Sequence, residues 1–271
     1  MTENKQKGRE LAPEHYEALG DAVYALEKNS LVGSISEFTS KPVDELLRKV
    51  PKQIRNKVET SVEKITFKCL DLAIKSLNQE SSTNKKKYDV FYTGAVGGMG
   101  GVFGIASLPI ELPITTILLL RSIANIAQNH GEDLRQLESR LACIEVFALS
   151  KAQKNDQSSI SYYASRAMLS KLSNDAIRIM SERGMAEISG AAMGGIAAQT
   201  ATKYSTVVSE KVLAGAIPIL GAIGGATVNI IFLNYFKNLA HGHFTIRRLE
   251  RIYGVEEIQR QFYLKSEEIK K

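Results

Sequence analysis

Six polar residues lie in apolar surroundings, where a charged or amide side chain needs a partner. They are Glu111, Arg121, Glu145, Asn229, His243 and Arg247. Glu111 lies between two prolines and follows residues 90–110, which contain no charged residue. Glu145 is the only charged residue between Leu141 and Leu149. Because a buried carboxylate is costly unless it is paired or protonated, we expect Glu145 to be buried with a partner.

The types of these residues allow two kinds of chemistry. Glu111, Glu145 and His243 are catalytic candidates, because two carboxylates and a histidine from separate helices can act as acid and base or hold a divalent cation. Arg121, Asn229 and Arg247 would then bind the ligand. The same groups could instead form a structural network in which Arg121 neutralises Glu111 or Glu145. The sequence has no ExxH or HExxH pair, so we predict no metal site, and no motif indicates a cofactor.

Two predicted helices must position most of these side chains. A helix over residues 112–129 would carry a polar face, which either points to solvent or forms an internal polar strip. That face comprises Glu111, Thr115, Arg121, Ser122, Asn125 and Asn129. If a second helix continues across Gly242, then Asn229, Phe236, His243 and Arg247 share one face. His241 would lie about 200° from His243, so the His-Gly-His motif could not bind one metal ion.

The remaining patterns predict further helices and no strand, so the expected fold class is all-α. We expect helices over residues 13–28, from about 42 to 50, over 54–77, over 132–151 and up to about residue 181. Residues 30–40 are predicted to form a serine-rich loop, and the segment Pro-Ile-Glu-Leu-Pro a turn. The polar residues 78–88 are the predicted linker. The expected parts are therefore an N-terminal tail and helical region (1–80), a helical core (88–254) and a charged C-terminal tail (255–271).

Two glycine-rich segments dominate the predicted core. The first, residues 93–120, contains three overlapping GxxxG pairs, and the second, within residues 188–236, contains two more. Such spacing lets helix backbones approach closely. Residues 212–236 contain no charged residue and are long enough to cross a bilayer, although Pro218 and several glycines fit a buried helical hairpin equally well. We therefore predict a multi-helix bundle with two glycine-rich apolar helical hairpin segments packed centrally.

The overall charge favours an anionic surface as a partner over nucleic acid. The chain has 271 residues, a net charge of +6 and 44% hydrophobic residues. Its basic residues are not interleaved with aromatic ones, so we expect no nucleic acid partner. Lys85, Lys86 and Lys87 form either a solvated loop or a patch that faces anionic lipid headgroups. Cys69 and Cys143 are expected to be buried thiols, and the charged start MTENKQKGRE predicts a cytoplasmic protein.

Three blocks of the sequence resemble one known family. LPIELPITTILLLRSIANIA, followed by GEDLRQLESRLACIEVFAL, is similar to the central signature of EcsC-family proteins. PILGAIGGATVNIIFLNYFKNLAHGHFTIRRLERIYG is similar to the C-terminal signature of that family. The resemblance spans Tyr92 to Gly254 and departs from the pattern at Glu111, where an aspartate is expected. It implies a mostly helical bacterial protein, cytoplasmic or membrane-associated, with no established reaction. The family is named after a gene that lies beside those for an ABC transporter.

Two hypotheses of function follow. In the first, the chain is a non-catalytic, membrane-associated accessory protein linked to transport or secretion. It would be peripheral to the inner membrane or partly inserted in it, with anionic lipid and a membrane transporter as partners. In the second, it is an enzyme or a small-ligand or metal-binding protein that uses the buried cluster of Glu, Arg, His and Asn residues.

Overall fold

The computed structural model describes residues 11–39, 43–48, 51–54, 56, 108–151, 162–183, 192–216 and 225–270. These residues form helices and no strand, which confirms the all-α fold class. Most of the predicted helix over 54–77, the linker, the lysine run and residues 93–107 of the first glycine segment lie outside the described residues. The elements are α1 (Pro13–Val23), η1 (Tyr24–Lys28), α2 (Leu31–Thr39), α3 (Val43–Arg48), α6 (Leu108–Asn129), α7 (Leu137–Ala148), α8 (Tyr162–Arg183), α9 (Ala192–Ala216), α11 (Gly225–Tyr253) and α12 (Val255–Lys270).

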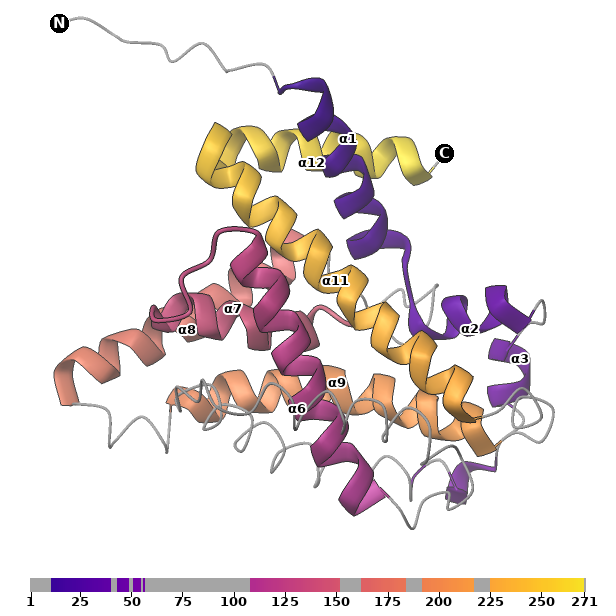
Figure 1. Ribbon diagram of the computed structural model, residues 1–271. Coiled ribbons are helices and arrows are strands. Elements are labelled where there is room, and N and C mark those ends of the chain that lie inside the picture. The colour runs from indigo at the N-terminus through magenta and orange to yellow at the C-terminus, as the bar shows by residue number, and fades with distance from the viewer. Residues whose placement is uncertain are drawn as a thin grey trace, which may run out of the picture.

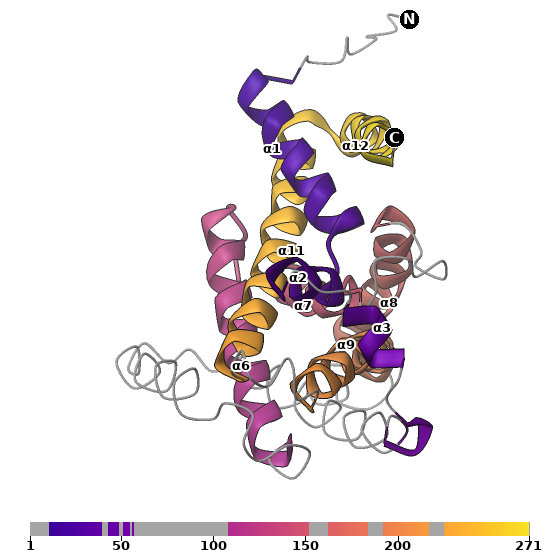
Figure 2. The ribbon, with the colours of Figure 1, turned by 90° about the vertical axis from the view of Figure 1, so that its right-hand side faces the viewer.

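Helix α11 is the central element of the bundle. It contacts α1, α2, α6, α7, α9 and α12, and it crosses the molecule diagonally in Figure 1. Helices α1 and α12 cover one end of α11, and α9 runs across the other end (Figure 1). Figure 2 shows α6 on one side of α11 and α8 and α9 on the other. Side chains that point inward from α11 therefore meet several other helices.

Aromatic side chains fill the interior between α7, α9 and α11. The ring centroid of Phe147 lies 4.7 Å from that of Tyr204 and 5.5 Å from that of Phe236. Phe232 is also buried and lies beside Phe236. Residues 141–150 are all buried, so α7 lies inside the bundle after its first turn. A helix that is apolar all round is expected in such a position.

The N-terminal helical region corrects one prediction and confirms another. Residues 13–28 are helical as predicted, as the α1 helix followed by the single π-helical turn η1. The predicted loop at 30–40 is wrong, because residues 31–39 form α2. The Ser30 hydroxyl accepts a hydrogen bond from Gly33 N at 3.0 Å and so caps this helix. Burial of Leu31 and Ile35, one turn apart, outweighs the weak helix propensity of the serines.

Helix α6 begins earlier than predicted and includes the supposed turn. It starts at Leu108 and runs through Pro109 and Pro113, so the segment Pro-Ile-Glu-Leu-Pro is helical. Pro109 lies in the first turn, where backbone N–H groups have no partner within the helix. Pro113 leaves only one carbonyl without its usual donor, at the start of the helix. Both prolines are therefore tolerated.

Helix α7 is shorter than the predicted helix over 132–151. Gly131, with φ +84°, lies just after the end of α6, where the sequence predicted the helix to end. Helix α7, however, begins only at Leu137. Residues 132–136 form a turn instead of the first helical turn. The side chain of Glu132 is buried in this turn and binds residues of other elements, which fixes the backbone outside the helix.

The uncharged stretch 212–236 is divided between two helices in the structure. Helix α9 ends at Ala216 and α11 begins at Gly225, while residues 217–224 lie outside the described part. Val228, Phe232 and Phe236 are buried in the protein interior. Within the described ranges, no helix has both the length and the apolar character needed to cross a membrane. The described part of this stretch therefore packs against protein.

Candidate functional site

Three of the six singled-out residues come together between α7, α8 and α11. His243 of α11 is fully buried, and its Nδ1 atom lies 3.1 Å from the Tyr162 hydroxyl at the start of α8. Its Nε2 atom faces the buried Glu145 of α7, with 4.0 Å between Nε2 and Oε2. The helix continues across Gly242, so His243 and Arg247 share one face as predicted.

Burial keeps His243 uncharged. It lowers the pKa of the imidazole well below its usual value, and the charges of Arg166 and Arg247 act in the same direction. Burial also raises the pKa of the Tyr162 hydroxyl, which therefore stays protonated. A neutral imidazole has one donor and one acceptor, and Nε2 makes no hydrogen bond to any described residue.

A second carboxylate, Glu250 of α11, is paired with the beginning of α8. Its Oε1 atom accepts hydrogen bonds from Arg166 Nη1 at 2.6 Å and from the Tyr163 hydroxyl at 2.9 Å. Only 5% of the Glu250 side chain is exposed, so this charge would be costly without the arginine. The tyrosine and the arginine together satisfy Oε1.

A third carboxylate, Glu132, binds two arginines of the α11 sequence RRLER, Arg247 and Arg251. Arg247 Nε donates to Oε1 at 2.8 Å and Arg247 Nη2 to Oε2 at 3.0 Å, which is a bidentate pair. Arg251 Nη1 also donates to Oε1, and the Ser139 hydroxyl donates to Oε2 at 2.7 Å. Burial acts to raise the pKa of Glu132, but the hydrogen bonds from Arg247 and Ser139 lower it to about 2. Glu132 is therefore ionised at neutral pH.

Glu111 is not part of this cluster. Its Oε1 atom accepts a hydrogen bond from Lys211 Nζ of α9 at 3.0 Å. Glu111 lies near the start of α6 and Glu132 follows the end of that helix, a separation of about 30 Å along the helix axis. The carboxylates therefore occupy two separate sites.

The other predicted ligand-binding residues are spread over the bundle. Arg121 is half-buried in the middle of α6, and Asn229 is half-buried near the start of α11. Asn229 precedes His243 by 14 residues on one helix, which corresponds to about 20 Å. The polar face of α6 runs from half-buried Glu111 and Thr115 to exposed Asn125 and Asn129, so its last turns point to solvent. Lys85, Lys86 and Lys87 lie outside the described residues.

Sequence reasoning missed Glu132, Arg166, Glu250 and Lys211. One signal was present in the sequence, because Glu250 and Arg251 stand three and four residues after Arg247 and so lie beside it on one helix. A run as charged as RRLER is typical of a solvated surface, so its composition did not indicate that these residues form buried ion pairs.

The described residues contain no group of three or more His, Cys, Asp or Glu side chains that could hold a metal ion. His241 points away from His243, and its Nδ1 atom lies 3.3 Å from Nε2 of His130. The two histidines of the His-Gly-His motif therefore face different neighbours. Burial raises the pKa of the Cys143 thiol to about 12, so this buried cysteine is an inert packing residue, as predicted.

The fold and the cluster define a helical protein whose interior contains matched ion pairs between α7, α8, α11 and the turn before α7. A model of the EcsC protein family matches residues 17–249, and the chain therefore belongs to the EcsC protein family. The match includes the first two blocks that showed the resemblance and the third up to Leu249, and it extends toward the N-terminus through most of α1. Neither the curated proteins nor the solved structures contained a match to the chain.

Proposed function

We propose that this EcsC-family chain is a non-catalytic accessory protein that attaches peripherally to the cytoplasmic surface of the inner membrane and serves a membrane transporter or secretion system. One observation carries the proposal. Lys85, Lys86 and Lys87 stand just before residues 90–110, which contain no charged residue. Lysines attract anionic headgroups, and an adjacent apolar segment can enter the boundary between headgroups and acyl chains.

The state of the buried cluster supports a non-catalytic role. Glu132 and Glu250 are both hydrogen-bonded to arginines, so these carboxylates are poor candidates for a base that must reach a substrate proton. Among the hydrogen-bonding groups of the cluster, Nε2 of His243 is the exception, since it has no hydrogen-bond partner among the described residues. Ion pairs of this kind fix the packing of helices. We infer that the cluster holds α7, α8 and α11 together.

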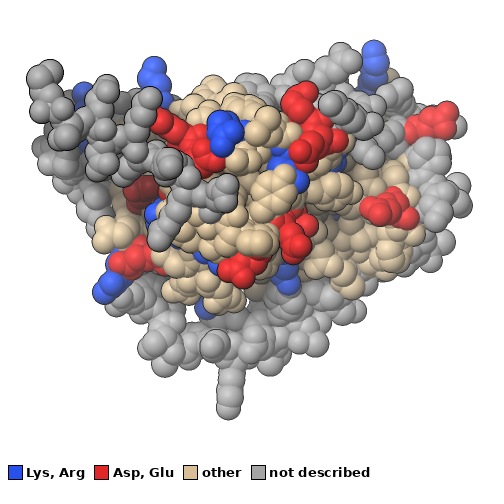
Figure 3. Space-filling view, turned by 90° about the horizontal axis from the view of Figure 1, so that it is seen from above, with Lys and Arg blue, Asp and Glu red and all other residues tan. Residues whose placement is uncertain are grey.

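The charge on α1 and α12 indicates which face would turn away from an anionic membrane. Figure 3 shows Asp and Glu side chains spread over the face that carries these two helices. Acidic residues of α1 and α12 outnumber the basic ones, Arg260, Lys265 and Lys270. The acidic residues are Glu14, Glu17, Asp21, Glu256, Glu257, Glu267 and Glu268. An anionic surface would repel this face, so we place the membrane contact elsewhere on the molecule.

The charge of the lysine run sets how much it contributes to the affinity for anionic lipid. A lysine near an anionic leaflet contributes about 1 kcal/mol, so three contribute about 3 kcal/mol, or roughly a hundredfold in affinity. This attraction falls within a Debye length of about 8 Å at physiological salt. Attachment that depends on these lysines must therefore weaken as the salt concentration rises.

Flotation with lipid vesicles tests the proposal. We expect the protein to float with vesicles that contain phosphatidylglycerol and not with vesicles of phosphatidylcholine alone. Replacing Lys85, Lys86 and Lys87 together by serine should weaken flotation by roughly a hundredfold at low salt. The control replaces Lys5, Lys7 and Lys271 by serine, which removes the same charge and should have a much smaller effect. Equal weakening in both variants, or no flotation of the original protein, would contradict the proposal.

A further inference from the structure

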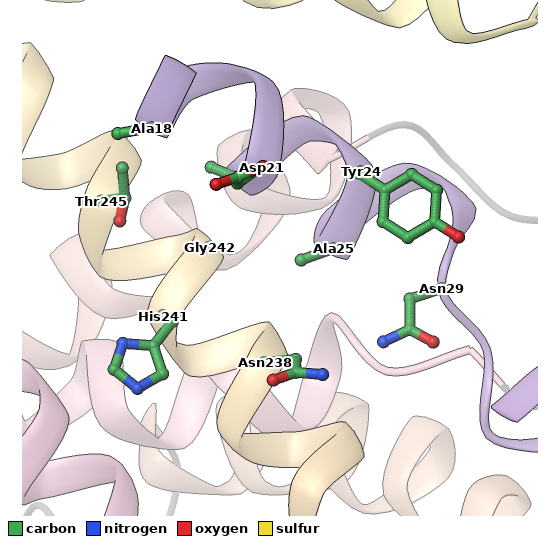
Figure 4. Close-up of a pocket in the computed structure, with 10 residues that line it drawn as sticks. Ala18, Asp21, Tyr24, Ala25, Asn29, Asn238, His241, Gly242 and Thr245 are labelled. Atoms are coloured by element: carbon green, nitrogen blue, oxygen red, sulfur yellow. The ribbon is translucent and has the colours of Figure 1, made fainter. Parts of the chain in front are cut away.

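A groove lies between α1 and η1 on one side and α11 on the other. Near residue 242, it is on the face of α11 opposite to the buried cluster. Its volume is about 410 Å³, within the range of roughly 300–1,000 Å³ that is usual for small-ligand pockets. The close-up in Figure 4 shows the groove with Asp21, Tyr24 and Asn29 on one wall and Asn238 and His241 on the other. None of these five residues takes part in the buried ion pairs.

Small residues bring the two walls together. A Cβ atom added at Gly242 would lie 3.1 Å from Leu26 Cγ and 3.2 Å from the Ala22 carbonyl oxygen, so α1 and η1 touch the α11 backbone there. The alanines at 18, 22 and 25 leave space beside this contact. The groove therefore lies beside a tight contact between two helices that pack against each other.

The π-helical turn shapes one end of the groove. Asn29 N donates to the Tyr24 carbonyl oxygen at 3.2 Å, five residues back, in place of the α-helical spacing of four. The extra residue allows Leu26 to be buried while Glu27 reaches Tyr162 N, to which its Oε1 atom is bonded at 2.9 Å. Tyr24 is left 59% exposed at the rim. Single π-helical turns occur often at functional sites.

The charge in the groove has one sign. Asp21 is the only Asp, Glu, Lys or Arg among the described residues that line it. Burial and the nearby charge of Lys237 lower the pKa of His241, so its imidazole is neutral at neutral pH. A cationic group is therefore favoured at the Asp21 end of the groove. The exposed ring of Tyr24 lies beside Asn29, toward the other end (Figure 4).

The far end of the groove presents amide side chains. The Ser34 hydroxyl lies 2.9 Å from Asn29 Oδ1 and 3.0 Å from the Ser30 carbonyl oxygen, and its single proton can be donated to only one of them. The Asn29 amide lies opposite the amide of Asn238 (Figure 4). An amide can both donate and accept, so this end suits an oxygen that makes a hydrogen bond, such as a hydroxyl. The two ends of the groove thus have complementary preferences.

We propose that this groove binds a small organic ammonium compound that carries an acceptor oxygen, such as an amino alcohol or its phosphate ester. Its ammonium group would contact the Asp21 carboxylate, and its oxygen would hydrogen-bond to the Asn29 amide. The same chemistry occurs in free ethanolamine and in the headgroup of phosphatidylethanolamine. The site does not depend on the membrane attachment proposed above.

Titration of the full-length protein with ethanolamine, followed by NMR chemical shifts of backbone amides, tests the site. We expect saturable shifts at groove residues, while ethylene glycol, which lacks the charge, and acetate, which is an anion, should give none. Asp21→Asn should weaken binding at least about threefold. Glu17→Gln, an exposed change one turn earlier on α1, is the matched control and should bind as the original protein does.

Equal binding of ethanolamine and ethylene glycol would overturn the proposal, as would saturable binding that is unchanged in Asp21→Asn. Absence of saturable shifts up to about 50 mM ethanolamine would overturn the proposal for free amines. The proposal would then stand only if vesicles show binding to the lipid headgroup. Vesicles of phosphatidylcholine with and without phosphatidylethanolamine distinguish the two sources. Binding that requires phosphatidylethanolamine and is lost in Asp21→Asn would assign the site to the headgroup. If neither arm depends on Asp21, the site does not exist.

Discussion

Glu132 accepts hydrogen bonds from three residues of the buried cluster. It lies in the turn between α6 and α7, and it joins Arg247 and Arg251 of α11 to Ser139 of α7. Only 3% of its side chain is exposed. Removing a buried carboxylate of this kind leaves the arginine charge without compensation, which is more costly than the net value of the ion pair itself.

We predict that Glu132→Gln lowers the free energy of unfolding by about 3 kcal/mol at pH 7. The carboxyl titrates near 4.5 in the unfolded chain and near 2 in the folded protein. Its contribution is therefore complete above pH 4.5 and is lost as the pH falls toward 2. Urea unfolding at pH 7 and pH 3 should show a difference between the two proteins that shrinks at pH 3.

Asp133→Asn is the control for this measurement, because the neighbouring Asp133 is exposed and pairs with the exposed Arg135. It should change the stability little at either pH. A Glu132→Gln protein as stable as the original at pH 7 would show that the arginines find other partners, and our account of the cluster would be wrong.

The sequence could predict part of this cluster. Glu145 stands out because it interrupts an apolar helical pattern, and helical spacing places His243 and Arg247 on one face; the structure brings the three together. Glu132 could not be found in this way, since it follows a helix-ending glycine in the polar segment GEDLRQ. Glu111 stands out for the same reason as Glu145, but its partner Lys211 is 100 residues away in the chain. Local patterns show that a charge needs a partner and do not identify the partner.

At the scale of elements, the contact between α1 and α11 depends on a residue without a side chain. Gly242 lies within α11, where glycine costs about 1 kcal/mol relative to alanine. That cost is accepted because the Ala22 carbonyl and Leu26 lie too close for a Cβ atom. In the sequence, this glycine is notable only as the middle of the His-Gly-His motif.

We predict that Gly242→Ala destabilises the protein by about 1–3 kcal/mol, because the backbone of α1 must move. Gly20→Ala is the matched control on the opposing helix, since a Cβ atom there would meet nothing within 4 Å. It should raise the stability by about 0.5–1 kcal/mol through helix propensity. Thermal unfolding of both variants measures the difference. The packing account fails if Gly242→Ala is as stable as Gly20→Ala.

Helix boundaries were predicted well where the sequence carries periodic apolar residues and poorly where local composition suggested a break. Residues 13–28 and the helix ending near 181 follow their periodicity. Helix α2 was missed because its serines resemble a loop, although Leu31 and Ile35 are buried in the core. The prolines of α6 suggested a turn, but they fall at the start of the helix, where a missing N–H costs little. Tertiary burial decided the first case and the position of the prolines in the helix decided the second.

At the scale of the whole molecule, the distribution of apolar residues favours packing against protein in the described part. The uncharged residues 212–236 suggested a membrane-crossing segment or a buried hairpin, and Phe232 and Phe236 are buried against α7 and α9. A run without charge has the same composition in lipid and in a helical core, so the sequence cannot distinguish the two. We propose peripheral attachment through the lysine run as a form of membrane association that is compatible with this packing.

Fractionation of cells that express the untagged protein tests this central claim most directly. Membranes are washed separately with high salt and with alkaline carbonate. We predict that the protein sediments with the membranes at low salt and is released by high salt, because attraction between lysines and anionic lipid is screened. Recovery entirely in the supernatant at low salt, or retention through both washes as expected of an inserted helix, would contradict peripheral attachment.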